Sequence, residues 1–114
     1  MAGEPAVFFE SAADFRAWLE QNHASANEVW VGYYKRAAGR TRLSYEEAVE
    51  EALCFGWIDG LTRGRDEHSY VQRFTPRRRN SNWSESNHRR VAKLIAEGRM
   101  RPAGLAAYEA RGIE

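Results

Sequence analysis

Residues 44–56 read SYEEAVEEALCFG, and this stretch decides how the rest of the chain can be arranged. Ser44 and Glu47 form a capping box, in which each side chain can accept a hydrogen bond from the other residue's amide. Gly56 is a natural helix end. The apolar residues recur at the spacing of one helix face: Tyr45, Ala48, Val49, Ala52 and Leu53. The acids between them are expected to face solvent: Glu46, Glu50 and Glu51.

Two strands and a helix are predicted before this segment. A short first strand is predicted over residues 6–9, and the stretch up to it, residues 1–6, is expected to be disordered. Ser11, with Asp14 three residues on, predicts a helix that ends near residues 22–23. Residues 29–35, VWVGYYK, are β-formers and nearly all apolar, which predicts a central strand covered on both faces.

Four more elements are predicted after residues 44–56. Residues 57–60 start a third strand or a turn, and residues 69–74 form its partner across a polar loop, 64–68. A third helix is predicted from Ser84 to Gly98, and a short last helix from Pro102 to Gly112. The buried face of the third helix is expected to hold Val91, Leu94 and Ile95. The order β-α-β-α-β-β-α-α predicts an α+β fold. We expect a small mixed or antiparallel sheet of about four strands, with three to four helices mostly on one face.

Length and composition predict one domain, residues 1–114, of the globular class. The chain is 43% hydrophobic and 29% charged, unlike a disordered protein. No apolar run has the length of a membrane span, and the start of the chain lacks the features of a signal peptide. The single cysteine, Cys54, excludes an internal disulfide and fits a reducing compartment. We therefore expect a cytoplasmic protein with no membrane insertion.

The net charge of +1 hides an asymmetry between the two halves of the chain. Residues 1–62 carry ten acids and five bases, whereas residues 63–114 carry six acids and twelve bases. Only Lys35 and Lys93 are lysines among the 17 basic residues. This arginine bias suggests directed hydrogen bonding or stacking, although a GC-rich genome would produce the same bias.

Residues 74–84, FTPRRRNSNWS, are the clearest candidate for a binding segment. Guanidinium groups bind carboxylates and phosphates and stack on aromatic rings, and the indole of Trp83 adds a large apolar face. Three interpretations stay open. The arginines 73, 77–79, 89 and 90, with Phe74, Trp83 and Trp57, could bind single-stranded nucleic acid. They could clamp a small anion at the start of the third helix, beside Ser84. They could instead pair with the glutamates of the second helix, with Trp83 in the core.

Other chemistry has weaker support in the sequence. Cys54 lies toward the C-terminal end of a helix, where the dipole raises a thiol pKa, so an inert packed thiol is expected. The histidines stand alone at positions 23, 68 and 88, without a metal-binding spacing, so no metal and no cofactor are expected. Asp59 lies between two glycines and is either an ordinary turn residue or the partner of an arginine.

Several motifs together resemble one family. Residues 47–60, EAVEEALCFGWIDG, residues 74–77, FTPR, residues 81–84, SNWS, with Asn87, and the 98–105 segment closely resemble the YdeI/OmpD-associated family of bacterial proteins. The resemblance covers about residues 8–112. It implies a role in protection against bacteriocins and cationic antimicrobial peptides, and by name a link to an envelope porin. It implies no reaction, cofactor or catalytic residue. Relatives usually continue further, which suggests a short member or a shortened chain.

These observations predict a non-enzymatic binding or stress-tolerance protein with an Arg/Trp-lined surface for an anionic or planar ligand, or for a protein or peptide partner. Its groove is expected between residues 57–59 and 77–83. The candidate binding residues are Trp30, Lys35, Trp57, Asp59, Arg73, Arg77, Ser81, Trp83, Ser84 and Asn87. The first alternative is a single-stranded nucleic-acid-binding protein, and the second is an enzyme that uses Asp59 or His23 as a base.

Overall fold

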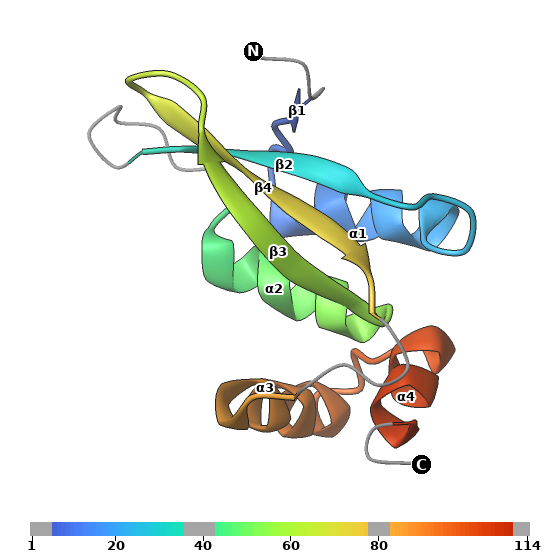
Figure 1. Cartoon of the computed structure of the whole chain (residues 1–114). Coiled ribbons are helices and arrows are strands. Elements are labelled where there is room, and N and C mark those ends of the chain that lie inside the picture. Colours follow the sequence, from blue (N-terminus) through green and yellow to red (C-terminus); the bar gives the residue numbers. More distant parts are fainter. Residues whose placement is uncertain (1–5, 36–42, 78–82, 111–114) are drawn as a thin grey trace.

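The computed structural model describes residues 6–35, 43–77 and 83–110, in which eight elements follow one another (Figure 1). The strands are β1 (Ala6–Val7), β2 (Val29–Tyr34), β3 (Trp57–Gly64) and β4 (Ser69–Pro76). The helices are α1 (Ala12–Asn22), α2 (Tyr45–Cys54), α3 (Glu85–Ala96) and α4 (Pro102–Glu109). The predicted α+β class and the predicted order of elements are confirmed. Several predicted features lie outside the described residues: the disorder of residues 1–5, the arginines 78 and 79, the binding residue Ser81 and the stop at Gly112.

The sheet is mixed, and its strands lie in the order β1-β2-β4-β3. β1 runs parallel to β2, while β4 is antiparallel to both β2 and β3. Ala6, expected within the disordered start, pairs with Trp30 as the first residue of β1. β2 and β4 therefore form the centre of the sheet, and β3 forms one edge.

Local hydrogen bonds start the helices where the sequence predicted. The Ser44 hydroxyl accepts the Glu47 amide at 3.2 Å, and the Glu47 carboxylate accepts the Ser44 amide at 3.0 Å, so the capping box is complete. Ser11 and Ser84 cap α1 and α3 in the same way, through the amides of the third residue after each. α4 starts with a proline at its first turn, which has no amide hydrogen to leave unpaired.

α1 and α2 cover one face of the sheet, and the main core lies between these layers (Figure 1). The side chains of β2 alternate between the two faces, as in any strand. Val29, Val31 and Tyr33 point into the core with Phe74 of β4. Trp30 and Gly32 are buried on the other face, where among the described residues there is no helix. The prediction that β2 is buried on both faces is confirmed, but side chains rather than helices cover its second face.

The C-terminal helices pack against α2 on the side away from the sheet (Figure 1). Gly104 of α4 makes this approach possible, because a Cβ there would overlap the backbone carbonyl of Cys54. The Arg101 amide donates to that same carbonyl at 3.0 Å. Gly56 has a φ of 79°, which lets the chain leave α2 and enter β3 directly.

Three local expectations were wrong. Asp59 lies within β3 rather than in a turn, because β4 pairs with residues 57–59 in register. β3 continues from its expected start through Arg63 to Gly64, so Gly64 belongs to the strand and not to the predicted polar loop. Ile95 is exposed, because one residue past the buried Leu94 the helix has turned by about 100°.

Candidate ligand-binding surface

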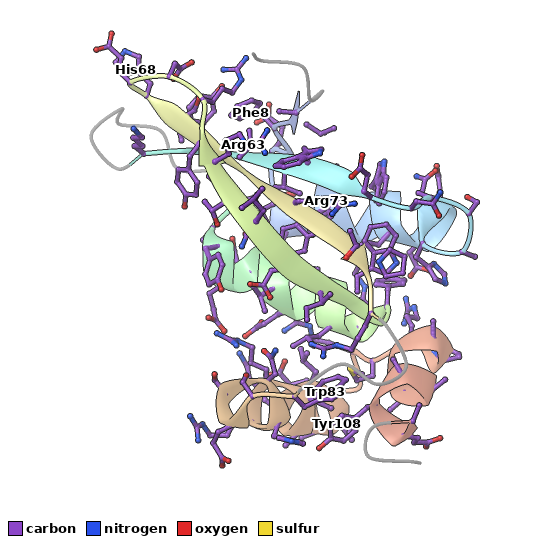
Figure 2. The ribbon with its side chains drawn as sticks, viewed as in Figure 1. Phe8, Arg63, His68, Arg73, Trp83 and Tyr108 are labelled. Carbon is purple, nitrogen blue, oxygen red and sulfur yellow. The ribbon has the colours of Figure 1, made fainter. Side chains whose placement is uncertain are left out.

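The helix-free face of the sheet carries a continuous row of arginine and aromatic side chains. Strand register places Trp30 of β2 opposite Arg73 of β4, and Val71 of β4 opposite both Gly32 of β2 and Arg63 of β3. Residues opposite one another in an antiparallel pair share a face. All of these side chains therefore lie on the face opposite α1 and α2. Figure 2 shows Phe8, Arg63 and Arg73 along this part of the sheet.

Two of the arginines lie over aromatic rings. The guanidinium carbon of Arg63 is 5.3 Å from the ring centre of Trp30, and that of Arg65 is 5.1 Å from the ring centre of Phe8. Phe8 also packs against Tyr34, with ring centres 4.9 Å apart. Both guanidinium distances fall within the range of cation–π attraction. We call this surface the arginine–aromatic layer; it consists of Phe8, Trp30, Tyr34, Arg63, Arg65 and Arg73.

A glycine shapes one end of the layer. The Phe8 ring lies so close to Gly32 that a Cβ on that residue would overlap it. The absence of a side chain at position 32 thus lets the ring lie flat on the sheet. Trp30 is only 6% exposed, and the guanidinium of Arg63 lies over its ring.

The acidic partners within the layer are exposed and weakly held. Arg73 donates to Glu28 at 2.6 Å, and Arg65 donates to Asp66 at 3.0 Å. The side chains of both pairs are close to half exposed. Ion pairs of this kind contribute about 0–1 kcal/mol. An incoming anion can therefore replace Glu28 or Asp66 at little cost.

The structure divides the predicted binding residues among three places. Trp30 and Arg73 lie side by side in the arginine–aromatic layer, and Lys35 is exposed just past the end of β2. Trp57 is 1% exposed in the core, where its indole donates to the His23 carbonyl at 3.3 Å. Asp59 faces the helices, so neither residue lies on the same face as Trp30 and Arg73.

The third place is a cluster formed by Arg77, Trp83, His88 and Tyr108, here called the C-terminal cluster. The guanidinium carbon of Arg77 is 3.8 Å from the ring centre of Trp83, and Trp83 packs edge-on against Tyr108 at 5.0 Å. His88 Nδ1 and the Tyr108 hydroxyl share a hydrogen bond of 3.0 Å. Figure 2 shows Trp83 and Tyr108 at the C-terminal helices.

Arg77 connects this cluster to the sheet. Its amide donates to the Gly56 carbonyl at 2.9 Å. Burial lowers the pKa of its guanidinium, and the negative charge of Asp59 opposes that shift. The cluster thus joins β4 to α3 and α4. Two other predicted binding residues belong to the start of α3. Ser84 caps this helix, and the side-chain oxygen Oδ1 of Asn87 accepts a hydrogen bond from Arg90 at 2.8 Å.

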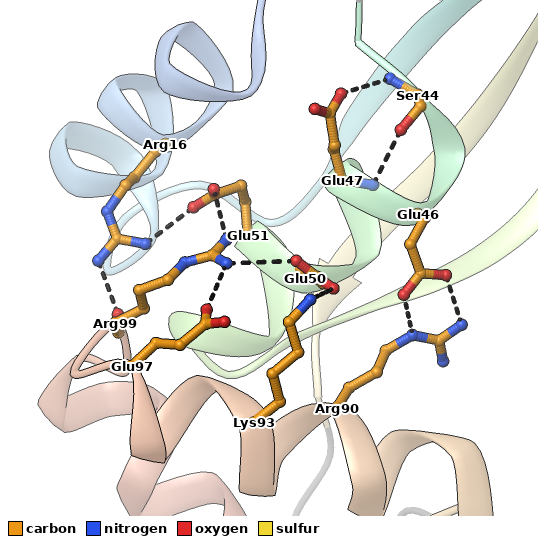
Figure 3. A network of polar contacts seen from close by, with 10 residues as sticks. All are labelled: Arg16, Ser44, Glu46, Glu47, Glu50, Glu51, Arg90, Lys93, Glu97 and Arg99. Carbon is orange, nitrogen blue, oxygen red and sulfur yellow. Dashed lines mark hydrogen bonds and ion pairs between the residues drawn. The ribbon is translucent and has the colours of Figure 1, made fainter.

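Two of the three α2 acids expected to face solvent are covered, which corrects the prediction for Glu50 and Glu51, while Glu46 is exposed as predicted (Figure 3). Glu50 and Glu51 are 7% and 5% exposed, because α3 and the chain after it lie over them. Arg99 bridges the two at 3.3 and 3.0 Å. We call this set of ion pairs the paired layer; it contains Arg16, Glu46, Glu50, Glu51, Arg90, Lys93, Glu97 and Arg99.

Pairing in this layer partly confirms the third interpretation, in which the arginines pair with glutamates of the second helix and Trp83 lies in the core. Arg90 forms a two-pronged contact with Glu46 at 2.8 and 2.9 Å, and Lys93 contacts Glu50 at 2.8 Å. Trp83 is partly buried and packs against the core. Arg89, by contrast, contacts only the exposed Glu85 of its own helix among its described ion pairs, at 3.5 Å.

Cys54 is buried, and the two candidate bases, His23 and Asp59, are hydrogen-bonded within the fold. Cys54 is fully buried, and this burial raises the pKa of its thiol, as the prediction of an inert cysteine requires. His23 Nδ1 lies 2.8 Å from the Leu19 carbonyl oxygen, where it caps the end of α1. The Asp59 carboxylate accepts from Tyr45 at 3.1 Å and from Gln72 at 3.5 Å.

Neither a metal cluster nor a membrane helix is found in the ranges that the structure describes. Within residues 6–35, 43–77 and 83–110, no three His, Cys, Asp or Glu residues come together as metal ligands. In the same ranges, every helix is too short or too polar to cross a bilayer.

Sequence reasoning missed Phe8, Tyr34, Arg63 and Arg65 as parts of a surface. Arg65 falls in the segment assigned to a polar loop, and Arg63 lies between that loop and residues 57–60, which were assigned to the start of a strand or a turn. Strand alternation gave no usable signal, because continued from Trp57 to Arg63 it places Arg63 on the core face with Trp57. The break in register between Asp59 and Thr62 reverses that alternation and brings Arg63 to the helix-free face.

Comparison with known proteins identifies the family of the chain. No match is found among the curated proteins or among the solved structures. A family model described as "Domain of unknown function (DUF8412)" matches residues 7–107, which include nearly all of the described strands and most of α4. The chain therefore belongs to this DUF8412 family of unknown function.

Proposed function

We propose that this protein is a binding protein for an anionic ligand with planar groups, and that it holds this ligand on the arginine–aromatic layer. One observation carries the proposal: an arginine lies over an aromatic ring twice on the same helix-free face, as Arg63 over Trp30 and Arg65 over Phe8. Guanidinium groups bind carboxylates and phosphates, and aromatic rings below them add a surface for planar groups.

Two other places on the molecule support an anionic ligand less well. A shallow hollow of about 270 Å³ between α2 and α3 is lined by Glu46 and Glu50 as well as by basic residues. Its carboxylates repel an anion, and its bases Arg90 and Lys93 are already paired. In the C-terminal cluster, Arg77 and Trp83 stack on each other and join β4 to the last helices.

The resemblance to YdeI/OmpD-associated proteins supplies a physiological setting for the proposal. In that setting the protein acts in the cytoplasm during exposure to antimicrobial peptides, and an envelope protein is a further candidate partner. A cationic peptide is not the ligand proposed for the arginine–aromatic layer, because like charges repel. The alternative of an enzyme has less support, because His23 is used to cap α1 and Asp59 accepts hydrogen bonds from Tyr45 and Gln72.

The four tryptophans allow a direct test by NMR. Trp30 reports on the arginine–aromatic layer, Trp83 on the C-terminal cluster, and Trp18 and Trp57 on the core. In a titration with ATP, a planar anion, we expect the Trp30 indole resonance to shift most. Inorganic tripolyphosphate carries similar charge without a ring and should produce a much smaller shift. Trp→Phe variants assign the four signals.

Two outcomes would contradict this proposal. If Trp83 shifts while Trp30 does not, the ligand binds at the C-terminal cluster. If ATP at 10 mM, tripolyphosphate and oligonucleotides all leave every indole signal unchanged, the layer binds no anion. A matched pair of variants localises the effect: Arg63→Ala should weaken ATP binding, whereas Arg89→Ala removes the same charge from α3 and should not.

A further inference from the structure

We infer that the ligand of the arginine–aromatic layer is single-stranded nucleic acid, an inference that rests on the proposed function and narrows it to one class of ligand. The argument depends on the repetition of the arginine–ring pair, the chemistry of its exposed side and the shape of the sheet face.

The two pairs form two separate platforms on one face. Trp30 and Tyr34 lie four residues apart on β2 and therefore point to the same side, about 13 Å apart along the strand. Arg63 covers Trp30 at one end, and Phe8, beneath Arg65, packs on Tyr34 at the other. A single nucleotide can occupy only one platform. A chain of nucleotides can occupy both, because it repeats a planar base and an anionic phosphate.

The platforms have the chemistry that unpaired bases require. Bases stack on aromatic side chains and on guanidinium planes in proteins that bind single strands. Here each guanidinium lies over a ring, while Arg63 and Arg65 are themselves exposed. Arg73, next to Trp30 on the same face, extends the basic surface along the sheet.

The same features disfavour two other anionic polymers. A duplex hides the faces of its bases, so it could use the arginines only as charges. An acidic peptide has carboxylates without planar rings, and unstacked arginines or lysines would serve it equally well. Neither ligand explains why the cations lie over aromatic rings on a face without helices.

The charge balance predicts a weak interaction with a shallow salt dependence. The chain has a net charge of +1, and Glu28 and Asp66 oppose the arginines within the layer. Contact with about three phosphates gives a slope of log K against log salt of about −2 for a single strand. A strongly basic nucleic-acid-binding surface would give a steeper slope.

Fluorescence anisotropy with labelled probes tests the inference on the full chain. The probes are thymidine oligonucleotides of four, eight and twelve nucleotides, labelled thymidine monophosphate, a twelve-base-pair duplex and polyglutamate. We expect the eight-nucleotide strand to bind at least tenfold more tightly than the monophosphate, with little further gain at twelve. The duplex and polyglutamate should bind at least tenfold more weakly than the single strand of twelve nucleotides.

Variants test the platforms themselves. Arg63→Ala should weaken single-strand binding about tenfold, which corresponds to about 1.4 kcal/mol. Arg63→Lys keeps the charge and should recover less than half of that loss in free energy, because an ammonium group does not stack. Arg89→Ala is the matched control and should change affinity less than twofold. Thermal melts of each variant verify that the fold is retained.

The outcomes separate this inference from the proposed function. Equal affinity for the monophosphate and the eight-nucleotide strand would overturn the inference and leave the proposed function in place. Equal or tighter binding of the duplex or of polyglutamate would overturn it too, the latter in favour of an acidic peptide. Failure of every probe, ATP included, would overturn both.

Discussion

Arginine plays opposite roles in the paired layer and in the arginine–aromatic layer. In the paired layer, Arg99 bridges two carboxylates that are almost fully buried, and Arg16 donates to Glu51 and to the Arg99 carbonyl. In the arginine–aromatic layer, Arg63 and Arg65 lie over rings on an open face. The first arrangement satisfies both charges inside the protein, whereas the second leaves Arg63 and Arg65 exposed.

The difference shows that the number of arginines in the basic half does not locate a binding site. Their partners do. A guanidinium held by buried carboxylates is committed to the fold, since its removal leaves an uncompensated charge. One held by a ring and an exposed carboxylate can exchange its partner for a ligand at a cost of about 1 kcal/mol or less. The contrast predicts large stability effects in the paired layer and small ones in the arginine–aromatic layer.

Glu51→Ala should destabilise the fold more than any other substitution in the two layers. The Glu51 side chain accepts from Arg16 at 2.8 Å and from Arg99 at 3.0 Å, and its loss leaves both guanidinium groups without a shared carboxylate. Breaking a buried ion pair by removing one partner destabilises a protein by about 3–5 kcal/mol. Urea denaturation followed by circular dichroism measures the change in the free energy of unfolding.

The control for this substitution lies in the arginine–aromatic layer. Arg73→Ala removes an exposed ion pair with Glu28 and should change the free energy of unfolding by about 0.5 kcal/mol or less. Equal losses from Glu51→Ala and Arg73→Ala would show that the two layers do not differ in their contribution to stability.

Two glycines extend the comparison to the backbone. Gly104→Ala should cost about 3 kcal/mol, because the new Cβ overlaps the Cys54 carbonyl, which is backbone and cannot move alone. Gly32→Ala overlaps only the tip of the Phe8 ring, which can swing away, so we expect a loss of about 1 kcal/mol. Thermal unfolding compares the two variants. A larger loss for Gly32→Ala would mean that the Phe8 ring is rigidly fixed.

Local patterns in the sequence predicted the elements well because they depend on neighbours along the chain. The cap at Ser44, the proline at the start of α4 and the glycine after α2 lie where expected. Burial of Glu50 and Glu51 could not be predicted in this way, because helical spacing assigned them to the solvent side. Their cover comes from α3 and the chain near Arg99, more than 40 residues later in the chain.

The same limit applies to the candidate surface. Residue type alone makes Trp30 and Arg73 separate candidates for ligand binding, and only the β2–β4 register brings them side by side. The predicted groove between residues 57–59 and 77–83 requires Trp57 and Asp59 on the surface. Strand alternation instead turns them toward the helices, and an expected turn at Asp59 concealed that alternation.

Trp83→Ala tests whether the C-terminal cluster serves the fold or the ligand. The indole packs between Arg77 and Tyr108 and is partly buried, so we expect a loss of about 2 kcal/mol, below the ~3–5 kcal/mol of a fully buried tryptophan. Affinity for ATP should change less than twofold. Lost binding with an unchanged melting temperature would instead place the ligand at the C-terminal cluster.

Acidification should produce the smallest effect, and Glu46 of the paired layer provides the test. The hydrogen bonds from Arg90 lower the pKa of Glu46 below its usual value of 4.5. Because the folded-state pKa is the lower one, this stabilisation is complete above about pH 4.5 and is lost as the pH falls through the folded-state pKa. Since the side chain of Glu46 is 53% exposed, we expect a contribution of about 0.5 kcal/mol.

The difference in urea midpoint between the unmodified chain and Glu46→Gln should therefore shrink between pH 7 and pH 3. A difference that stays constant across this range would mean that the pair of Glu46 with Arg90 does not contribute to stability.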